Sequence, residues 1–177
     1  KKALDLNPND FLILNGLGLS YMQLGNYEKS LLYYNKSLDV RYNEPAIEGL
    51  GKAYYWLEEY GKAYFFLNKS YNFNPGNNVV VSYFLSSLNT IGMYDEAISL
   101  AKEALKKELN NSHHYRKIGI AYFFKGDKEE ALINLKKAVE LEPSQSPNQL
   151  SMSIVYLSLK DIDNAYKHIE KAIEISK

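Results

Sequence analysis

Apolar residues recur along the chain at the spacing of amphipathic helices, and residues 112–145 show the pattern clearly. Ile118 and Tyr122 lie four residues apart, so they fall on one face of a helix. Gly126 interrupts this pattern, because glycine favours the left-handed turn that ends a helix. The periodicity then resumes and stops at Pro143, whose ring cannot continue a helix. The segment therefore predicts two helices joined by a tight turn.

The same pattern returns along the whole chain at intervals of 33 or 34 residues. One small residue lies in the second helix of every unit, and another small residue follows it seven positions later. The first series is Ser30, Ala63, Ala97, Ala131 and Ala165, and the second is Ser37, Ser70, Ala104, Ala138 and Ala172. Packed helices approach most closely where side chains are smallest, so each unit is expected to be an antiparallel helix pair.

A glycine and a tyrosine at fixed positions add a second signature to the first helix of the pairs. It occurs as Leu17-Gly18-x-x-Tyr21, Leu50-Gly51-x-x-Tyr54 and Ile118-Gly119-x-x-Tyr122. Together with the small-residue series, this signature resembles the tetratricopeptide repeat (TPR) family over the entire chain. The resemblance implies an all-α fold, a right-handed superhelical solenoid of antiparallel helix pairs. It also implies that the first helix of each pair lines a concave face.

The period divides the chain into five expected repeats within a single domain that covers 10–177. Their approximate bounds are 11–43, 44–77, 78–111, 112–145 and 146–177. Residues 1–9 match the end of a second helix and are interpreted as the end of a truncated upstream repeat. Leu85 replaces the family glycine, so the helices of the third repeat are expected to splay or shift. No polar capping helix follows Lys177, which predicts partial exposure of Ile169, Ile173 and Ile175.

Composition narrows the classes of function. The chain has 21 basic and 21 acidic residues. A net charge of zero argues against a nucleic-acid binder, which needs a basic surplus, and against a polybasic membrane-surface module. No run of about 18 apolar residues occurs, so membrane insertion is not expected. Cysteine is absent, which excludes disulfides, zinc-thiolate sites and thiol catalysis and leaves the cellular compartment open.

Motifs of catalysis and cofactor binding are absent from the sequence. The chain is therefore not expected to be an enzyme, to hold a cofactor or to bind a metal, and no catalytic residue is assigned. His113 and His114 are adjacent, so in a helix they point about 100° apart and ligate one metal poorly. They are interpreted as solvated residues at a helix start.

The concave face is the informative surface, and helical geometry selects its residues. The candidate groove residues are Asn15, Lys52, Tyr55, Trp56, Tyr83, Asn89, Arg116, Lys117, Phe123 and Phe124. An exposed apolar band marks a binding site, and aromatic residues with arginine are typical of hot spots. For Tyr55, Trp56, Phe123 and Phe124, packing into neighbouring repeats is the alternative role.

These features predict a non-enzymatic protein–protein interaction scaffold that binds a peptide or a partner helix in its concave groove. Lys52, Arg116 and Lys117 outnumber the single groove acid Glu48, which favours an amphipathic, acidic partner segment. A clamp for chaperone tails is not expected, because only Lys117 keeps the character of the clamp residues in the family. Two alternatives stay open: a structural module that self-assembles through its uncapped ends or its groove, and the recognition arm of a larger enzyme.

Overall fold

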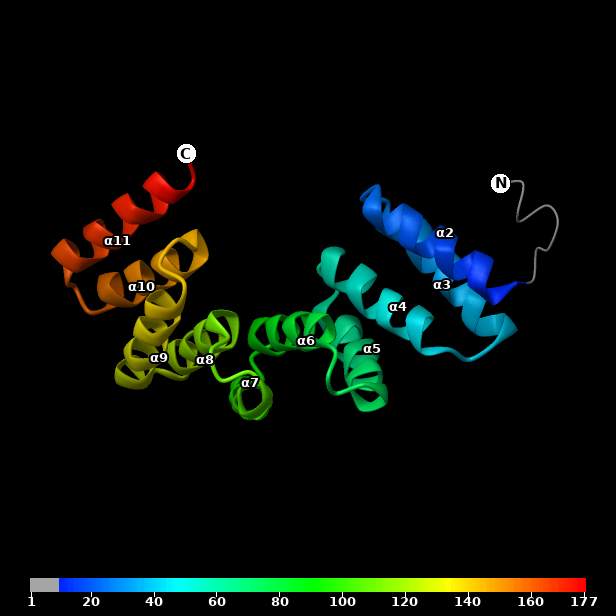
Figure 1. The fold of residues 1–177 in the computed structure, drawn as a ribbon, viewed down its shortest axis with the longest axis horizontal. Coiled ribbons are helices and arrows are strands. Elements are labelled where there is room, and N and C mark those ends of the chain that lie inside the picture. The colour runs from blue at the N-terminus through cyan, green and yellow to red at the C-terminus, as the bar shows by residue number, and fades with distance from the viewer. Residues whose placement is uncertain (1–9) are drawn as a thin grey trace. The chain divides into compact units, whose positions relative to one another are not determined.

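The structure is a computed structural model that describes residues 10–177. This part of the chain contains ten α-helices and no strand. Figure 1 shows how consecutive helices follow one another. The helices are α2 (Phe11–Gln23), α3 (Tyr27–Val40), α4 (Glu44–Trp56), α5 (Tyr60–Phe73), α6 (Asn78–Thr90), α7 (Tyr94–Lys107), α8 (Ser112–Lys125), α9 (Lys128–Leu141), α10 (Ser146–Ser158) and α11 (Ile162–Ile175). The all-α fold class is confirmed. The expected end of an upstream repeat, 1–9, lies outside the described residues.

The chain divides into two compact units, Lys1–Ser87 and Leu88–Lys177, and the division falls within α6. In the first unit α2 packs on α3, α3 on α4 and α4 on α5. In the second unit α7 packs on α8, α8 on α9, α9 on α10 and α10 on α11 (Figure 1). Consecutive helices therefore pair as the repeat predicts. That residues 10–177 form a single domain of five repeats stays a prediction.

Asparagine and aspartate side chains determine where many of the helices begin. Those that accept a backbone N–H of the first turn are Asp10, Asn26, Asn43, Asn77, Asn111, Asp127 and Asp161. Gly126 ends α8 with φ 91°, as the sequence predicts. Glu58 and Lys160 take the same left-handed conformation, both at φ 61°, in turns without glycine. No helix among the described residues is long and apolar enough to cross a membrane.

The small residues lie where the helices touch. All five members of the first series are at most 1 % exposed. A Cβ atom added to Gly119 would stand 2.6 Å from Leu135 Cγ and 3.1 Å from the Ala131 carbonyl oxygen. Glycine at this position thus lets α9 approach α8. Leu85, at the equivalent position of the third repeat, is completely buried.

Two glycines on neighbouring helices of the first unit are expected to respond oppositely to substitution by alanine. A Cβ atom on Gly49 would overlap the ring of Tyr34, which is 4 % exposed, whereas a Cβ atom on Gly16 meets nothing within 4 Å. Gly49→Ala should therefore cost about 1–3 kcal/mol in overpacking, against roughly 1 kcal/mol gained in helix propensity. Gly16→Ala should stabilise by up to about 1 kcal/mol.

Chemical unfolding followed by circular dichroism measures both effects. Combining Gly49→Ala with Tyr34→Ala should cost less than the sum of the single changes, because the smaller side chain leaves room for the methyl group. Equal and favourable effects of both glycine substitutions would show that Tyr34 does not fill this contact.

Candidate functional site

An aromatic cluster in the first unit surrounds Trp56, at the end of α4. Trp56 is 49 % exposed and stacks on Tyr27 of α3, with ring centroids 6.0 Å apart and planes 8° apart. Its Nε1–H donates a hydrogen bond to the Tyr83 hydroxyl of α6 at 3.1 Å. Tyr55 meets the Tyr83 ring edge-on at 5.0 Å and the Tyr60 ring at 5.5 Å. Three predicted groove residues, Tyr55, Trp56 and Tyr83, are therefore brought together.

A hollow of about 230 Å³ in the first unit lies between α2 and α4. Its lining residues are Asn15, Gly16, Leu19, Tyr34, Pro45, Glu48 and Lys52. Tyr34 is the one lining residue that comes from α3. Burial, with a smaller contribution from the charge of Glu48, raises the pKa of Tyr34 to about 12, so its hydroxyl stays protonated.

The polar groove residues of this hollow already have partners within the chain. Glu48 accepts a hydrogen bond from Lys52 Nζ at 2.6 Å and another from Asn77 Nδ2 at 3.1 Å. The Asn15 amide donates to Asn43 Oδ1 at 2.8 Å, and the same oxygen caps α4. Lys52 is thus neutralised by its neighbour one helical turn away. The surplus of positive charge expected on the groove does not extend to this unit.

The second unit contains the other two predicted groove cations, both on α8. Lys117 is largely buried, and this burial, followed by the charge of Arg116, lowers its pKa to about 8. No carboxylate of the described residues forms an ion pair with Lys117. An Arg116 Nη2 atom lies 3.1 Å from His113 Nδ1. Because guanidinium groups only donate, Nδ1 accepts this bond and the His113 proton lies on Nε2.

The two adjacent histidines differ from the expectation of solvated side chains. His114 is 1 % exposed, and neither of its ring nitrogens has a hydrogen-bond partner. Burial lowers its pKa, although Glu108 opposes the shift. Burial also lowers the pKa of His113 to about 3, and Lys117, Arg116 and His114 add to the effect. Both imidazoles are therefore neutral at physiological pH.

The repeat register explains the burial of His114. In α4, α6, α8 and α10, the residue five positions before Gly51, Leu85, Gly119 and Ser153 is Ala46, Val80, His114 and Asn148, respectively, and all four are at most 2 % exposed. The signal was present in the sequence, but it is visible only when the repeats are compared with one another.

An apolar pocket of about 140 Å³ lies between α8 and α10 in the second unit. Its lining residues are Ile120, Phe123, Phe124, Leu135, Ser151, Ile154 and Val155. Phe124 is 60 % exposed and stacks on Tyr94, with centroids 5.8 Å apart. Phe123 is half-buried and also packs against the core of α9 and α10. The alternative role, packing between repeats, thus applies in part to Phe123.

Asn89, another predicted groove residue, is only 8 % exposed. Its Nδ2 donates to the backbone carbonyl of Lys117 at 3.0 Å, so it ties α6 to α8 rather than facing outward. The ten candidate residues fall equally on the two units: Asn15, Lys52, Tyr55, Trp56 and Tyr83 in the first, and Asn89, Arg116, Lys117, Phe123 and Phe124 in the second. Their role in binding stays a prediction.

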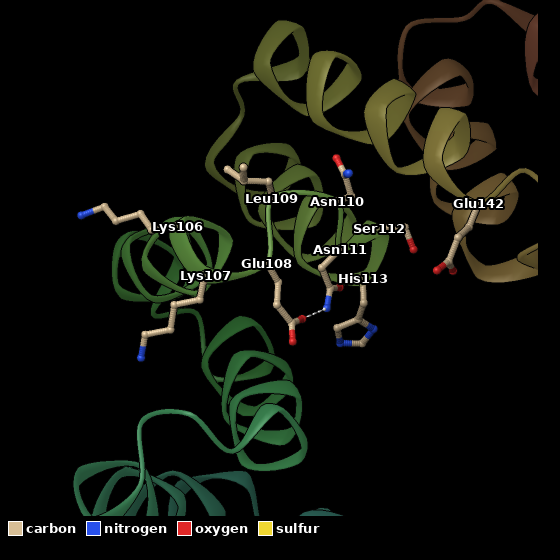
Figure 2. A pocket seen from close by; sticks show the side chains of 9 residues that line it. All are labelled: Lys106, Lys107, Glu108, Leu109, Asn110, Asn111, Ser112, His113 and Glu142. Atoms are coloured by element: carbon tan, nitrogen blue, oxygen red, sulfur yellow. Dashed lines mark hydrogen bonds between the residues drawn. The ribbon is translucent and has the colours of Figure 1, made fainter.

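A polar hollow of about 670 Å³ at the start of α8 was missed by the sequence analysis. Its lining residues are Lys106, Lys107, Glu108, Leu109, Asn110, Asn111, Ser112, His113 and Glu142. The Asn111 amide donates a hydrogen bond to Glu108 Oε2 at 2.8 Å. Figure 2 shows this bond, with the side chains of Lys106 and Lys107 extending away from it. The charges are mixed, and the described residues contain no cluster of three potential metal ligands. The hollow therefore shows no geometry for a metal.

Comparison with known proteins identifies the repeat. Two family profiles, both described as tetratricopeptide repeat, match residues 11–43 and residues 115–145 and 149–177. No curated protein matches the sequence.

Solved structures of MamA share the fold. MamA 41-end from Desulfovibrio magneticus RS-1 is 18 % identical, with TM-score 0.80 over 94 % of both chains. A further MamA crystal structure is 21 % identical, with TM-score 0.77 over 93 % of this chain and 91 % of that one. MamA MSR-1 is 20 % identical, with TM-score 0.72 over 94 % and 96 %. On its helix pairs, its repeat signature and the matching profiles, the chain belongs to the tetratricopeptide repeat family, whose members serve as protein-interaction scaffolds.

Proposed function

We propose that this TPR scaffold binds a peptide or a partner helix on the groove face of its first helices, without catalysis of its own. The observation that carries the proposal is the exposure of aromatic rings on that face. Trp56 is 49 % exposed and Phe124 is 60 % exposed. Tryptophan in a preformed setting is the residue type that most often dominates protein–protein affinity.

The aromatic cluster around Trp56 is held in place before any ligand arrives. The stack on Tyr27 and the hydrogen bond to Tyr83 fix the indole from two sides. A ligand that covers the exposed part of the ring therefore immobilises little additional side-chain freedom, which favours binding. We therefore expect an apolar side chain of the ligand to bind to this aromatic cluster in the first unit.

Charge in the second unit favours an acidic group on the ligand. Lys117 has no ionic partner among the described residues, and its pKa is lowered to about 8 by burial and by Arg116. A ligand carboxylate would stabilise the charged ammonium. Ile120 and Phe124 follow Lys117 by one and two turns of α8 and line the apolar pocket. An amphipathic segment with an acid followed by an apolar side chain fits this order.

Affinity capture with matched variants tests the proposal. The double variant Trp56→Ala/Phe124→Ala should lose the partners that the wild type retains. Phe65→Ala is the control, because Phe65 is an equally exposed aromatic residue, at 50 %, on α5, the second helix of its pair. Once a partner has been captured, its affinity can be measured directly. Trp56→Ala should weaken the affinity of this chain for that partner by about 10- to 100-fold, mainly through faster dissociation.

The charged residues should affect a different step of the same binding reaction. Arg116→Glu/Lys117→Glu should slow association strongly at low salt and little at high salt, because charges beside a binding face steer encounters and salt screens them. A basic partner would contradict the proposal. So would a partner that binds Trp56→Ala, Trp56→Ala/Phe124→Ala and Arg116→Glu/Lys117→Glu as tightly and as fast as it binds the wild type.

A further inference from the structure

In the first unit, an aromatic ring of the chain itself fills the space between two consecutive first helices. The ring is that of Tyr34 on α3, which is 4 % exposed. A Cβ atom added to Gly18 of α2 would stand 2.8 Å from this ring, and a Cβ atom added to Gly49 of α4 would overlap it. The ring therefore lies between α2 and α4, in a space that the two glycines keep open.

The second unit has the same arrangement with a smaller side chain. The repeat register places Leu135 of α9 at the position of Tyr34. It places Gly119 of α8 and Ser151 of α10 at the positions of the two glycines. Leucine is shorter than tyrosine, so it does not extend as far between the helices. The apolar pocket of about 140 Å³ between α8 and α10, which Leu135 and Ser151 both line, is the space that remains.

The walls of this pocket suit an apolar ring. Ser151 is the single polar residue of the lining, and its hydroxyl already donates to the Pro147 carbonyl at 2.8 Å. Cavities of about 150 Å³ with walls of leucine, isoleucine and phenylalanine stay dry and take up benzene. The rings of Phe123 and Phe124 in the wall meet edge-on, with centroids 5.4 Å apart, and aromatic rings favour such contacts with a further ring.

A cation beside the pocket lacks an acidic partner. Lys117 precedes Ile120 of the pocket wall by three residues, so both side chains lie on one face of α8. The ion pairs found within residues 10–177 do not include Lys117. Its charge is therefore complementary to a ligand that carries an acid next to an apolar group.

We propose that the pocket between α8 and α10 binds an aromatic side chain of the partner segment, in the space that Tyr34 fills in the first unit, with an acidic group of the same segment beside Lys117. This inference rests on the proposed function and specifies the apolar anchor for the second unit. Phe124 on α8 is 60 % exposed and Ile154 on α10 is 52 % exposed, and both line the pocket. The bound ring covers apolar surface on both helices.

Fluorine NMR with fluorobenzene as the probe tests the pocket without any partner. The wild type should bind fluorobenzene saturably. Leu135→Tyr/Ser151→Gly copies the first unit and fills the pocket from within. It should bind fluorobenzene about 10- to 100-fold more weakly, the loss expected when one aromatic ring can no longer be buried. Ser151→Gly alone leaves the pocket open and is the matched control. Circular dichroism establishes that each variant is folded.

A second variant leaves the buried core intact. Ile154→Asp places a hydrated carboxylate in the pocket wall and should also weaken fluorobenzene binding at least about 10-fold. Leu157→Asp is its control, because Leu157 is 47 % exposed on the same helix and lies outside the pocket. A wild type that does not bind fluorobenzene would overturn the proposal. So would undiminished binding to both Leu135→Tyr/Ser151→Gly and Ile154→Asp.

Competition against fluorobenzene by phenylacetate and by phenylacetamide tests the acidic group. Phenylacetate should bind about 2- to 5-fold more tightly than the amide, because its carboxylate pairs with Lys117. Lys117→Met should remove the difference between the two competitors. Equal affinities for the wild type would show that the acidic group does not lie beside Lys117.

A captured partner distinguishes this inference from the proposed function. Leu135→Tyr/Ser151→Gly should weaken its binding at least about 10-fold, and replacing the anchoring aromatic residue of the partner by alanine should add little to that loss. A partner that requires Trp56 and tolerates the filled pocket would overturn the aromatic anchor and leave the proposed function standing. A partner that tolerates both changes would contradict both.

Discussion

Leu85→Gly should lower the free energy of unfolding by about 3–6 kcal/mol, the largest effect expected from a single substitution in this chain. Leu85 stands where the repeat has glycine, yet its side chain is completely buried. Its removal leaves a cavity that costs about 2–5 kcal/mol, and glycine within a helix costs roughly 1 kcal/mol more. Restoring the family residue should therefore destabilise the protein, because the neighbours of Leu85 are packed around the larger side chain.

Two further variants separate the contributions to that loss. Leu85→Ala creates most of the cavity and keeps good helix propensity, so it should be about 1 kcal/mol less damaging than Leu85→Gly. Val79→Gly, at a 52 % exposed position of the same helix, should show only the cost of glycine in a helix. Denaturant midpoints from circular dichroism measure all three. A wild-type midpoint for Leu85→Gly would mean that its side chain packs against nothing.

The fold was predictable because the same signals for helix ends and helix contacts recur in each repeat of the sequence. Gly126 was expected to end one helix, and the structure shows a left-handed cap there, followed by Asp127 as the N-cap of the next helix. The turns at Glu58 and Lys160 lack glycine, yet they keep the same left-handed geometry. Packing of the two flanking helices therefore outweighs the local preference of a single turn residue.

The candidate site was harder to predict, because periodicity selects a face of a helix and does not identify the partners of its side chains. Lys52 was assigned to the groove as a cation, and its pairing with Glu48 depends on rotamers. Asn89 was placed on the groove face, and its bond to the Lys117 carbonyl depends on the distance between two helices. The aromatic residues could be selected from the sequence, because the residue type gives the size of the side chain and the repeat register gives the helix face on which it lies.

Acidification from pH 7 to pH 5 should destabilise the second unit and leave the first unit unchanged. All three histidines, His113, His114 and His168, lie in the second unit, and burial lowers the pKa of each. The unfolded chain binds these protons near pH 6.5, whereas folded His113 binds its proton only near pH 3. The stability that neutral His113 contributes is thus complete above pH 6.5 and is lost progressively as the pH falls toward 3.

At pH 5 this loss amounts to about 2 kcal/mol for His113, with His114 acting in the same direction. Hydrogen exchange read by mass spectrometry should therefore show faster exchange at pH 5, after correction for the intrinsic rate, in residues 88–177 only. Trp56 is the single tryptophan and lies in the first unit, so its fluorescence reports that unit separately. His113→Gln/His114→Gln should remove most of the pH dependence, because glutamine does not titrate. Equal protection of the second unit at both pH values would show that these imidazoles are hydrated and free to protonate.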